Sequence, residues 1–270
     1  MSTTPQAAAA PANEAILLRQ EANGVCTLTL NRPAQYNALS EALLAELQRA
    51  LDDIAADSSI GVVVLAANGK AFCAGHDLKE MRRRPEQAYY ETLFNACSRM
   101  MLSLTRLPQP VIARVHGVAT AAGCQLVASC DMAVAAATAG FGTSGINTGL
   151  FCMTPGVALS RKVGRKDALE MLFTGEIVPA ERALAMGLVN RVVPPEQLDD
   201  AVNELARKIL GMSRAAIAAG KRVFYRQIEL GLSEAYDFAG KEMACNMMFE
   251  DVGEGIDAFI AKRKTVWRHR

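Results

Sequence analysis

The hydrophobic pattern of the first half of the chain alternates between strand-like and helix-like segments. Residues 16–20 and 25–30 flank Asn23-Gly24, a pair typical of the tight turn of a β-hairpin. Ser40 then precedes apolar residues at helical spacing, and it is a good N-cap. The residues at this spacing are Leu43, Leu44, Leu47, Leu51 and Ile54. Continuous apolar runs at 61–67 and 110–115 predict strands that are covered on both faces.

The hydrophobic pattern also predicts the elements of the rest of the chain. It predicts helices over 87–105 and 121–129 and a short strand over 132–135, followed by a largely helical last third. The helices expected there cover 167–173, 180–186, 196–210, 213–228, 232–246 and 252–263. Strands that alternate with helices indicate an α/β fold with a parallel sheet covered by helices. The predicted organisation is a disordered tail at 1–12, a core at 13–195 and a helical oligomerisation region at 196–270.

Composition and charge exclude several classes of protein. The chain has 270 residues, of which 51% are hydrophobic, so it can bury a sizeable core. A net charge of +1 gives no support for a nucleic-acid partner, and no apolar run is long enough for a membrane span. The N-terminus has no Lys or Arg before Arg19, which argues against a targeting peptide and predicts a cytoplasmic protein. Seven scattered Cys and three His show no metal-ligand spacing, and no dinucleotide or P-loop motif occurs, so no metal or cofactor is expected.

Two junctions between a strand and a helix carry runs of small residues. The first covers 71–81, where Asp77 can cap a helix, and the second covers 117–126. Backbone amides at the start of a helix point outward as hydrogen-bond donors. Two such donors from separate loops can hold one developing negative oxygen, which is the arrangement of an oxyanion hole. The simpler alternative for the first segment is an ordinary tight turn.

Together these residues resemble the crotonase superfamily, the enoyl-CoA hydratase/isomerase family, over residues 13–267. The matching segments are Asn31-Arg32-Pro33 with Asn37-Ala38-Leu39, residues 71–79, residues 110–131, and Ala258-Phe259 with Lys262-Arg263. The resemblance is strongest, within one branch of the family, at 119–131 and 149–159. It implies a spiral of ββα units with a C-terminal helical region that trimerises, as a homotrimer or a hexamer.

The resemblance also implies an acyl-CoA ligand, with coenzyme A entering as part of the substrate and not as a cofactor. The thioester oxygen would lie between the amides of His76 and Ala122. The adenine end would lie along 74–79, that is, Ala74, Gly75, His76, Asp77, Leu78 and Lys79. Phe259 and Lys262, from a neighbouring subunit, would cover the nucleotide. One departure weakens this site, because the family often has Lys after Asn-Arg-Pro, where this chain has Ala34.

A second departure concerns catalysis. Family hydratases use two glutamates, and this chain has Gln125 and Gly145 at those positions. An amide can orient water but cannot take its proton, and glycine offers no functional group. Asp131 is the one carboxylate between Thr92 and Lys166, and the resemblance makes it structural. Ordinary hydration is therefore doubtful, since one positioned acid or base contributes about 10²–10⁴ in rate. The double change Gln125→Glu with Gly145→Glu is expected to restore hydration if the pocket geometry survives.

Several roles stay open at this point. Gln125 could orient water or substrate, the His76 side chain could titrate, and Cys124 or Cys152 could act as a nucleophile. The first hypothesis is an acyl-CoA enzyme that works through the oxyanion hole with help from Gln125. The alternative is a non-catalytic acyl-CoA binder or regulator, and an RNA-binding scaffold is a weaker third option.

Overall fold

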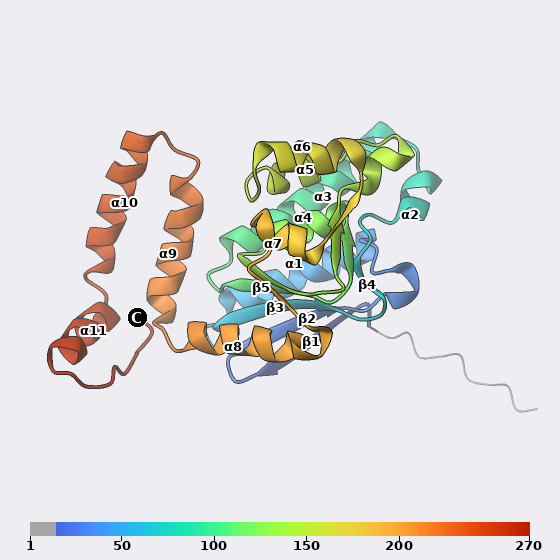
Figure 1. The fold of residues 1–270 in the computed structure, drawn as a ribbon. Coiled ribbons are helices and arrows are strands. Elements are labelled where there is room, and N and C mark those ends of the chain that lie inside the picture. The colour runs from blue at the N-terminus through green and yellow to red at the C-terminus, as the bar shows by residue number, and fades with distance from the viewer. Residues whose placement is uncertain (1–14) are drawn as a thin grey trace, which may run out of the picture.

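The computed structural model describes residues 15–270 (Figure 1), so the tail predicted at 1–12 lies outside the described residues. A six-stranded sheet forms the centre of the fold, in the order β1-β2-β3-β5-β7-β10. Its strands are β1 (Leu17–Ala22), β2 (Val25–Leu30), β3 (Val62–Ala67), β5 (Val111–Val115), β7 (Met132–Ala136) and β10 (Arg191–Val193). The first two strands form the antiparallel hairpin predicted around Asn23-Gly24, and every other pairing is parallel.

Helices cover both faces of this sheet, as the continuous apolar runs predict. In β3, Val63 and Leu65 pack into the larger core, against helices α1 (Glu41–Ala56) and α3 (Gln87–Arg106). Val62 and Val64 pack into a smaller core on the opposite face, under helix α8 (Leu198–Leu210). Ser40 caps α1 by accepting a hydrogen bond from the Leu43 amide.

A second, four-stranded sheet was not predicted from the sequence. It has the order β4-β6-β8-β9 and lies beside the first sheet (Figure 1). Its strands are β4 (Ala71–Cys73), β6 (Val118–Thr120), β8 (Gly140–Gly142) and β9 (Ile177–Pro179). Three residues are too few to show a period, so strands of this length leave no pattern in the sequence. Both small-residue junctions run through this sheet.

Shorter helices connect and surround the two sheets. They are α2 (Leu78–Arg83), α4 (Ala122–Ser129), α5 (Met153–Leu159), α6 (Arg165–Thr174) and α7 (Ala180–Ala185). Short 3-10 turns occur at η1 (Pro33–Gln35), η2 (Ser144–Thr148) and η3 (Pro195–Gln197). No helix within residues 15–270 combines the length and apolar character that crossing a membrane requires.

The last three helices stand away from the rest of the molecule (Figure 1). This C-terminal arm consists of α9 (Arg214–Gln227), α10 (Leu232–Asn246) and α11 (Glu250–Ile260). Helix α11 ends before the predicted position 263, and the chain finishes without regular structure. The arm exposes many large apolar side chains, among them Phe224, Leu232, Tyr236, Met243, Met248, Phe259 and Ile260.

One buried polar cluster fastens the arm to the core. The Lys221 ammonium of α9 donates to Asp131 at 2.6 Å and to the carbonyls of Leu104 and Gln109, each at 2.9 Å. The Tyr225 hydroxyl donates to the other Asp131 oxygen at 2.9 Å. Asp131 also accepts the Val111 amide at 2.7 Å. The carboxylate is thus fully engaged, in agreement with the structural role expected for it.

Candidate active site

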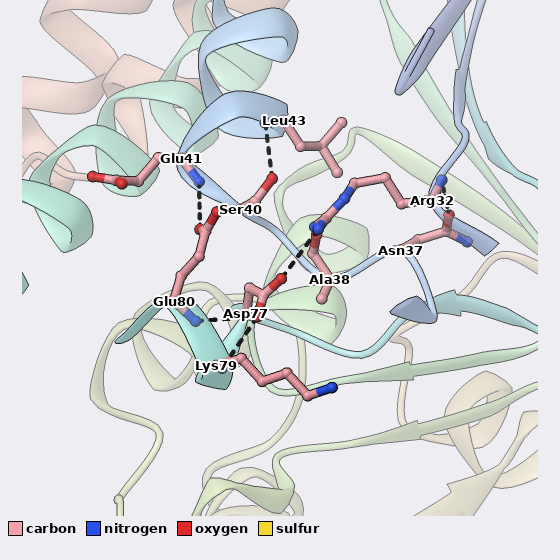
Figure 2. Close-up of polar contacts among 9 residues, drawn as sticks. All are labelled: Arg32, Asn37, Ala38, Ser40, Glu41, Leu43, Asp77, Lys79 and Glu80. Atoms are coloured by element: carbon pink, nitrogen blue, oxygen red, sulfur yellow. Dashed lines mark hydrogen bonds and ion pairs between the residues drawn. The ribbon is translucent and has the colours of Figure 1, made fainter. Parts of the chain in front are cut away.

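The loop at 74–79 is held in place by the Asn-Arg-Pro segment (Figure 2). Asp77 caps α2 by accepting hydrogen bonds from the amides of Lys79 and Glu80, as the sequence predicts. Its second oxygen pairs with the Arg32 guanidinium at 3.1 Å, and both side chains are largely buried. Burial opposes ionisation of Asp77, but Arg32 and the helix amides outweigh it and lower the pKa of this carboxyl.

Asn37 fixes the chain that leads into the same loop. It is fully buried, and its amide group donates to the carbonyls of Asn68 at 2.8 Å and Ala71 at 2.9 Å. Backbone hydrogen bonds from Ala74 to Tyr36 and from Leu39 to Gly75 complete the connection. The sequence motif that carries the family resemblance therefore works as the scaffold of this loop, a role that its residue types alone did not reveal.

The second loop is held under backbone strain. Ala121 lies at φ 50° and ψ −121°, a region that glycine occupies readily and alanine does not. Its amide donates to the Gly142 carbonyl at 2.9 Å. Beside it, the hydroxyls of Thr120 and Ser144 lie 2.7 Å apart in a hydrogen bond that the sequence did not predict. These contacts fix the position at which α4 begins.

Two glycines allow the loops to meet. A Cβ on Gly75 would lie 2.9 Å from the Ala121 Cβ and 3.2 Å from the Ala122 nitrogen, so the loops are in direct contact. A Cβ on Gly123 would lie 2.1 Å from the Cys73 carbonyl oxygen. Neither the His76 amide nor the Ala122 amide has a hydrogen-bond acceptor within residues 15–270. The fold thus brings two unused donors from separate loops to one place, as expected from the two junctions.

His76 is partly buried, and both nitrogens of its ring are shielded from solvent. It packs edge-on against Phe94 of α3, with ring centroids 5.4 Å apart. Neither ring nitrogen has a hydrogen-bond partner in the described chain. Burial lowers the pKa of His76 to about 4, with partial opposition from the Leu39 backbone. The ring is therefore neutral at physiological pH, so it offers one N–H donor and one acceptor.

Gln125 lies in the first turn of α4 and is only 5% exposed. Its Oε1 atom is buried without a donor among residues 15–270. Gly145 lies in η2, where a Cβ would be 2.5 Å from the Leu150 carbonyl oxygen and 2.7 Å from the Cys152 sulfur. A glutamate at 145 therefore requires the 150–152 turn to shift, so the pocket geometry on which the restored hydration depends would not be kept unchanged.

Other candidate groups are poorly suited to acid–base or nucleophilic work. Burial raises the pKa of the Cys124 thiol to about 12 and also raises that of Cys152, so both stay protonated and unreactive. His116 bonds the Gly69 carbonyl through Nε2 at 2.8 Å, which fits a structural role. Among residues 15–270, no three His, Cys, Asp or Glu side chains gather as they would around a metal ion.

The structure does not bring all the predicted binding residues together within one chain. Ala74, Leu78 and Lys79 are exposed on the first loop, close to the amides. Phe259 and Lys262 belong to the end of the C-terminal arm, which lies on the opposite side of the molecule from α2 (Figure 1). In a single chain these two residues cannot cover a ligand at the loop.

Comparison with known protein families identifies the fold. A family described as enoyl-CoA hydratase/isomerase matches residues 20–270. Among curated proteins, enoyl-CoA hydratase domain-containing protein 3, mitochondrial, of Rattus norvegicus is 46% identical over 93% of this chain and 83% of its own length. The resemblance to this branch that residues 119–131 and 149–159 indicate is confirmed. The predicted cytoplasmic location is contradicted, because the names of these relatives point to mitochondria.

Solved structures agree with this result. An enoyl-CoA hydratase of Mycobacterium smegmatis is 60% identical, with a TM-score of 0.93 over 94% of this chain and 99% of that one. Human enoyl-CoA hydratase domain-containing protein 3 is 44% identical, with a TM-score of 0.91 over 94% of this chain and 100% of that one. The predicted α/β fold of the crotonase type, with its helical C-terminal region, is confirmed.

Proposed function

Because the chain belongs to the enoyl-CoA hydratase/isomerase family, we propose that it binds an acyl-CoA thioester whose carbonyl oxygen accepts hydrogen bonds from the amides of His76 and Ala122. The observation that carries this proposal is the pair of unused amide donors where Gly75 contacts the second loop. Backbone donors of a folded protein rarely lack an acceptor, so two of them at one place favour a ligand that supplies one.

With the thioester oxygen at these two amides, the positions of the nucleotide and of the acyl group follow. The nucleotide lies along Ala74–Lys79, and the acyl group passes toward Gln125 and Gly145. Phe259 and Lys262 reach the nucleotide from a neighbouring subunit of a homotrimer or hexamer. The exposed apolar side chains of the C-terminal arm support such an assembly, since a monomer rarely leaves so many uncovered.

This geometry favours chemistry in which negative charge develops on the thioester oxygen. Such charge appears in an enolate or in a tetrahedral adduct, and one preorganised donor contributes about 10²–10³ in rate. Gln125 orients the reacting group, and the neutral His76 ring can accept a proton. Ordinary enoyl-CoA hydration is disfavoured because both glutamate positions lack an acid.

A non-catalytic acyl-CoA binder is the second candidate. The observation in its favour is that the one carboxylate between Thr92 and Lys166 is occupied by Lys221 and Tyr225. Without a carboxylate free to move protons, the loops would hold the thioester without transforming it.

Calorimetry with two matched ligands tests binding. Butyryl-CoA carries the carbonyl oxygen, whereas S-butyl-CoA replaces the carbonyl by a methylene group. We expect butyryl-CoA to bind about tenfold more tightly, since two amide hydrogen bonds are worth roughly that much after desolvation. Failure of both ligands to bind the assembled protein would overturn the proposal.

A turnover screen then separates the enzyme from the binder. Crotonyl-CoA is followed by loss of its enoyl absorbance, and 3-hydroxyacyl-CoA and malonyl-CoA by chromatography, with a family hydratase as positive control. Turnover of any of the three supports the enzyme. Binding without turnover above buffer supports the non-catalytic alternative.

A further inference from the structure

The buried polar cluster around Asp131 lies at the far end of the helix that begins at the second loop. Helix α4 starts with Ala122, whose amide is one of the two unused donors, and Asp131 comes directly after its C-cap, Cys130. At a rise of about 1.5 Å per residue, eight residues place the two ends about 12 Å apart. A group that holds Asp131 therefore acts on the same short helix as the ligand of the Ala122 amide.

Helix α4 is a stiff connection between these two ends. All eight of its residues are buried. The Ser129 hydroxyl donates to the Gln125 carbonyl at 2.8 Å, and the Cys130 thiol donates to the Leu126 carbonyl at 3.3 Å. Close-packed interiors transmit strain because they have little free volume in which to absorb it. A displacement at one end of α4 is therefore passed to the other end.

The first end of α4 is held against backbone strain. Ala121 keeps φ 50° and ψ −121°, a conformation that persists in alanine only where the surroundings enforce it. On this side the Ala121 amide bonds the Gly142 carbonyl, and Gly123 lies against the Cys73 carbonyl. A strained start needs a fixed point at the other end of the helix, since the strain would otherwise relax by a small shift of α4. Asp131 supplies that fixed point.

Two side chains of the C-terminal arm hold Asp131 in place. Lys221 pairs with one carboxylate oxygen at 2.6 Å, and Tyr225 donates to the other at 2.9 Å. The side chains of Lys221 and Asp131 are only 7% and 14% exposed, so water weakens their attraction far less than it weakens a surface pair. Burial and the nearby carboxylate raise the pKa of Tyr225, so its hydroxyl keeps the proton that it donates.

We propose that Lys221 and Tyr225 are positioning residues, which act through Asp131 and α4 to keep the Ala122 amide where it meets the thioester oxygen. This inference rests on the proposed function, because it presumes a thioester held by the His76 and Ala122 amides. It gives the C-terminal arm a role in the site of its own chain, in addition to its role in assembly.

Calorimetry with butyryl-CoA and S-butyl-CoA isolates this role. The two ligands share the nucleotide and the alkyl chain, so a variant that only loosens the fold or the cover of the nucleotide weakens both alike. A displaced amide weakens butyryl-CoA alone and lowers the ratio of the two affinities. The variants are compared at a protein concentration at which light scattering gives the wild-type mass.

Tyr225→Phe is the mildest variant, because it removes one donor to Asp131 and keeps the ring. We expect the ratio of about ten in the wild-type protein to fall to about three, since a misaligned hydrogen bond loses much of its energy. In Lys221→Met the ratio should fall to about one. Should Lys221→Met fail to fold, because its buried carboxylate is left without a cation, Tyr225→Phe decides the question.

The matched control breaks another contact between the arm and the core. Glu229 follows α9 and pairs with Arg161 at 3.0 Å, and both side chains are half-exposed and do not touch Asp131. Glu229→Gln should therefore keep the ratio at about ten. Adding Ala121→Gly to Tyr225→Phe should restore the ratio, because glycine adopts the strained conformation without being held there.

The outcomes separate the inference from the proposed function. An unchanged ratio in folded Tyr225→Phe would overturn the inference, and so would a ratio that falls equally in Glu229→Gln, because any loosening of the arm would then suffice. A ratio that Ala121→Gly does not restore would also overturn it, since strain at the start of α4 would not be what the anchor holds. If the wild-type protein binds neither ligand, or binds both equally, the proposed function itself fails.

Discussion

The two loops that carry the His76 and Ala122 amides differ from the C-terminal arm in the kind of group that they leave without a partner. At the loops most apolar side chains are buried, with Leu78 as an exception, and the unused groups are polar: two amides, the His76 ring and the Gln125 oxygen. In the arm the uncovered surface is largely made of apolar side chains. All eight residues of α4 are buried, whereas α10 buries Ala235 alone among its fifteen residues. Unpaired polar groups favour a small ligand, and an uncovered apolar face favours a second protein surface.

The largest expected effect tests how tightly the loops are packed. Gly123→Ala places a methyl group against the Cys73 carbonyl and should cost about 3–5 kcal/mol, with loss of thioester binding. The matched change in the arm is Gly240→Ala in α10, where a Cβ meets nothing within 4 Å. That change should stabilise the protein by about 0.5–1 kcal/mol through helix propensity. Chemical denaturation measures the free energy of unfolding of both variants. Equal changes would contradict the expectation that the loops are tightly packed and the arm is not.

The neutral His76 ring should make stability depend on pH. The pKa of His76 is lowered by burial to about 4 in the folded protein, against about 6.5 in an unfolded chain. As the pH falls from 6.5 to 4, the unfolded state takes up the proton first, so up to about 3 kcal/mol of stability is lost over this window. The loss should be absent in His76→Asn. Denaturation at pH 7 and pH 4 measures it, and parallel losses in both proteins would refute the assignment.

The free-energy cost of removing an ion pair should also differ between the two loops and the arm. Arg32→Met leaves the Asp77 carboxylate unpaired in a largely buried place and should cost about 2 kcal/mol. Arg222→Met in the arm breaks an exposed pair with Glu242 and should cost under about 1 kcal/mol. Denaturation of the two variants under the same conditions compares them. A cost for Arg222→Met as large as that for Arg32→Met would show that the arm pair is not merely a surface contact.

The smallest effect concerns backbone strain at the second loop. Ala121→Gly should stabilise the protein by up to about 1 kcal/mol, because glycine adopts φ 50° and ψ −121° without the penalty that alanine bears. The gain is limited because glycine also increases the entropy of the unfolded chain. Thermal unfolding measures the change, and a clear loss of stability would show that the loop is not strained.

The sequence predicted the long elements well because their signals are local. The Asn23-Gly24 turn, the Ser40 cap and the 3.6-residue leucine pattern of α1 each depend on neighbours in the chain. The short strands of the second sheet depend on partners that are distant in sequence, so they were missed.

The meeting of the two loops was predicted to a similar extent, whereas the roles of their residues stay predictions. The small-residue junctions identified the two loops, since small side chains are what a close approach requires. The pairing of Arg32 with Asp77 joins residues 45 positions apart, and no local pattern reveals it. The collision that blocks a side chain at Gly145 depends equally on the path of the 150–152 turn, which the residue types do not specify.

Gly145 also limits how the protein can evolve. One substitution cannot place an acid at this position without moving its neighbours, because the Leu150 carbonyl and the Cys152 sulfur occupy the space that its first carbon needs. The turn would have to shift to admit any side chain at this position. Single substitutions at neighbouring positions are therefore more compatible with this turn than an acid at position 145.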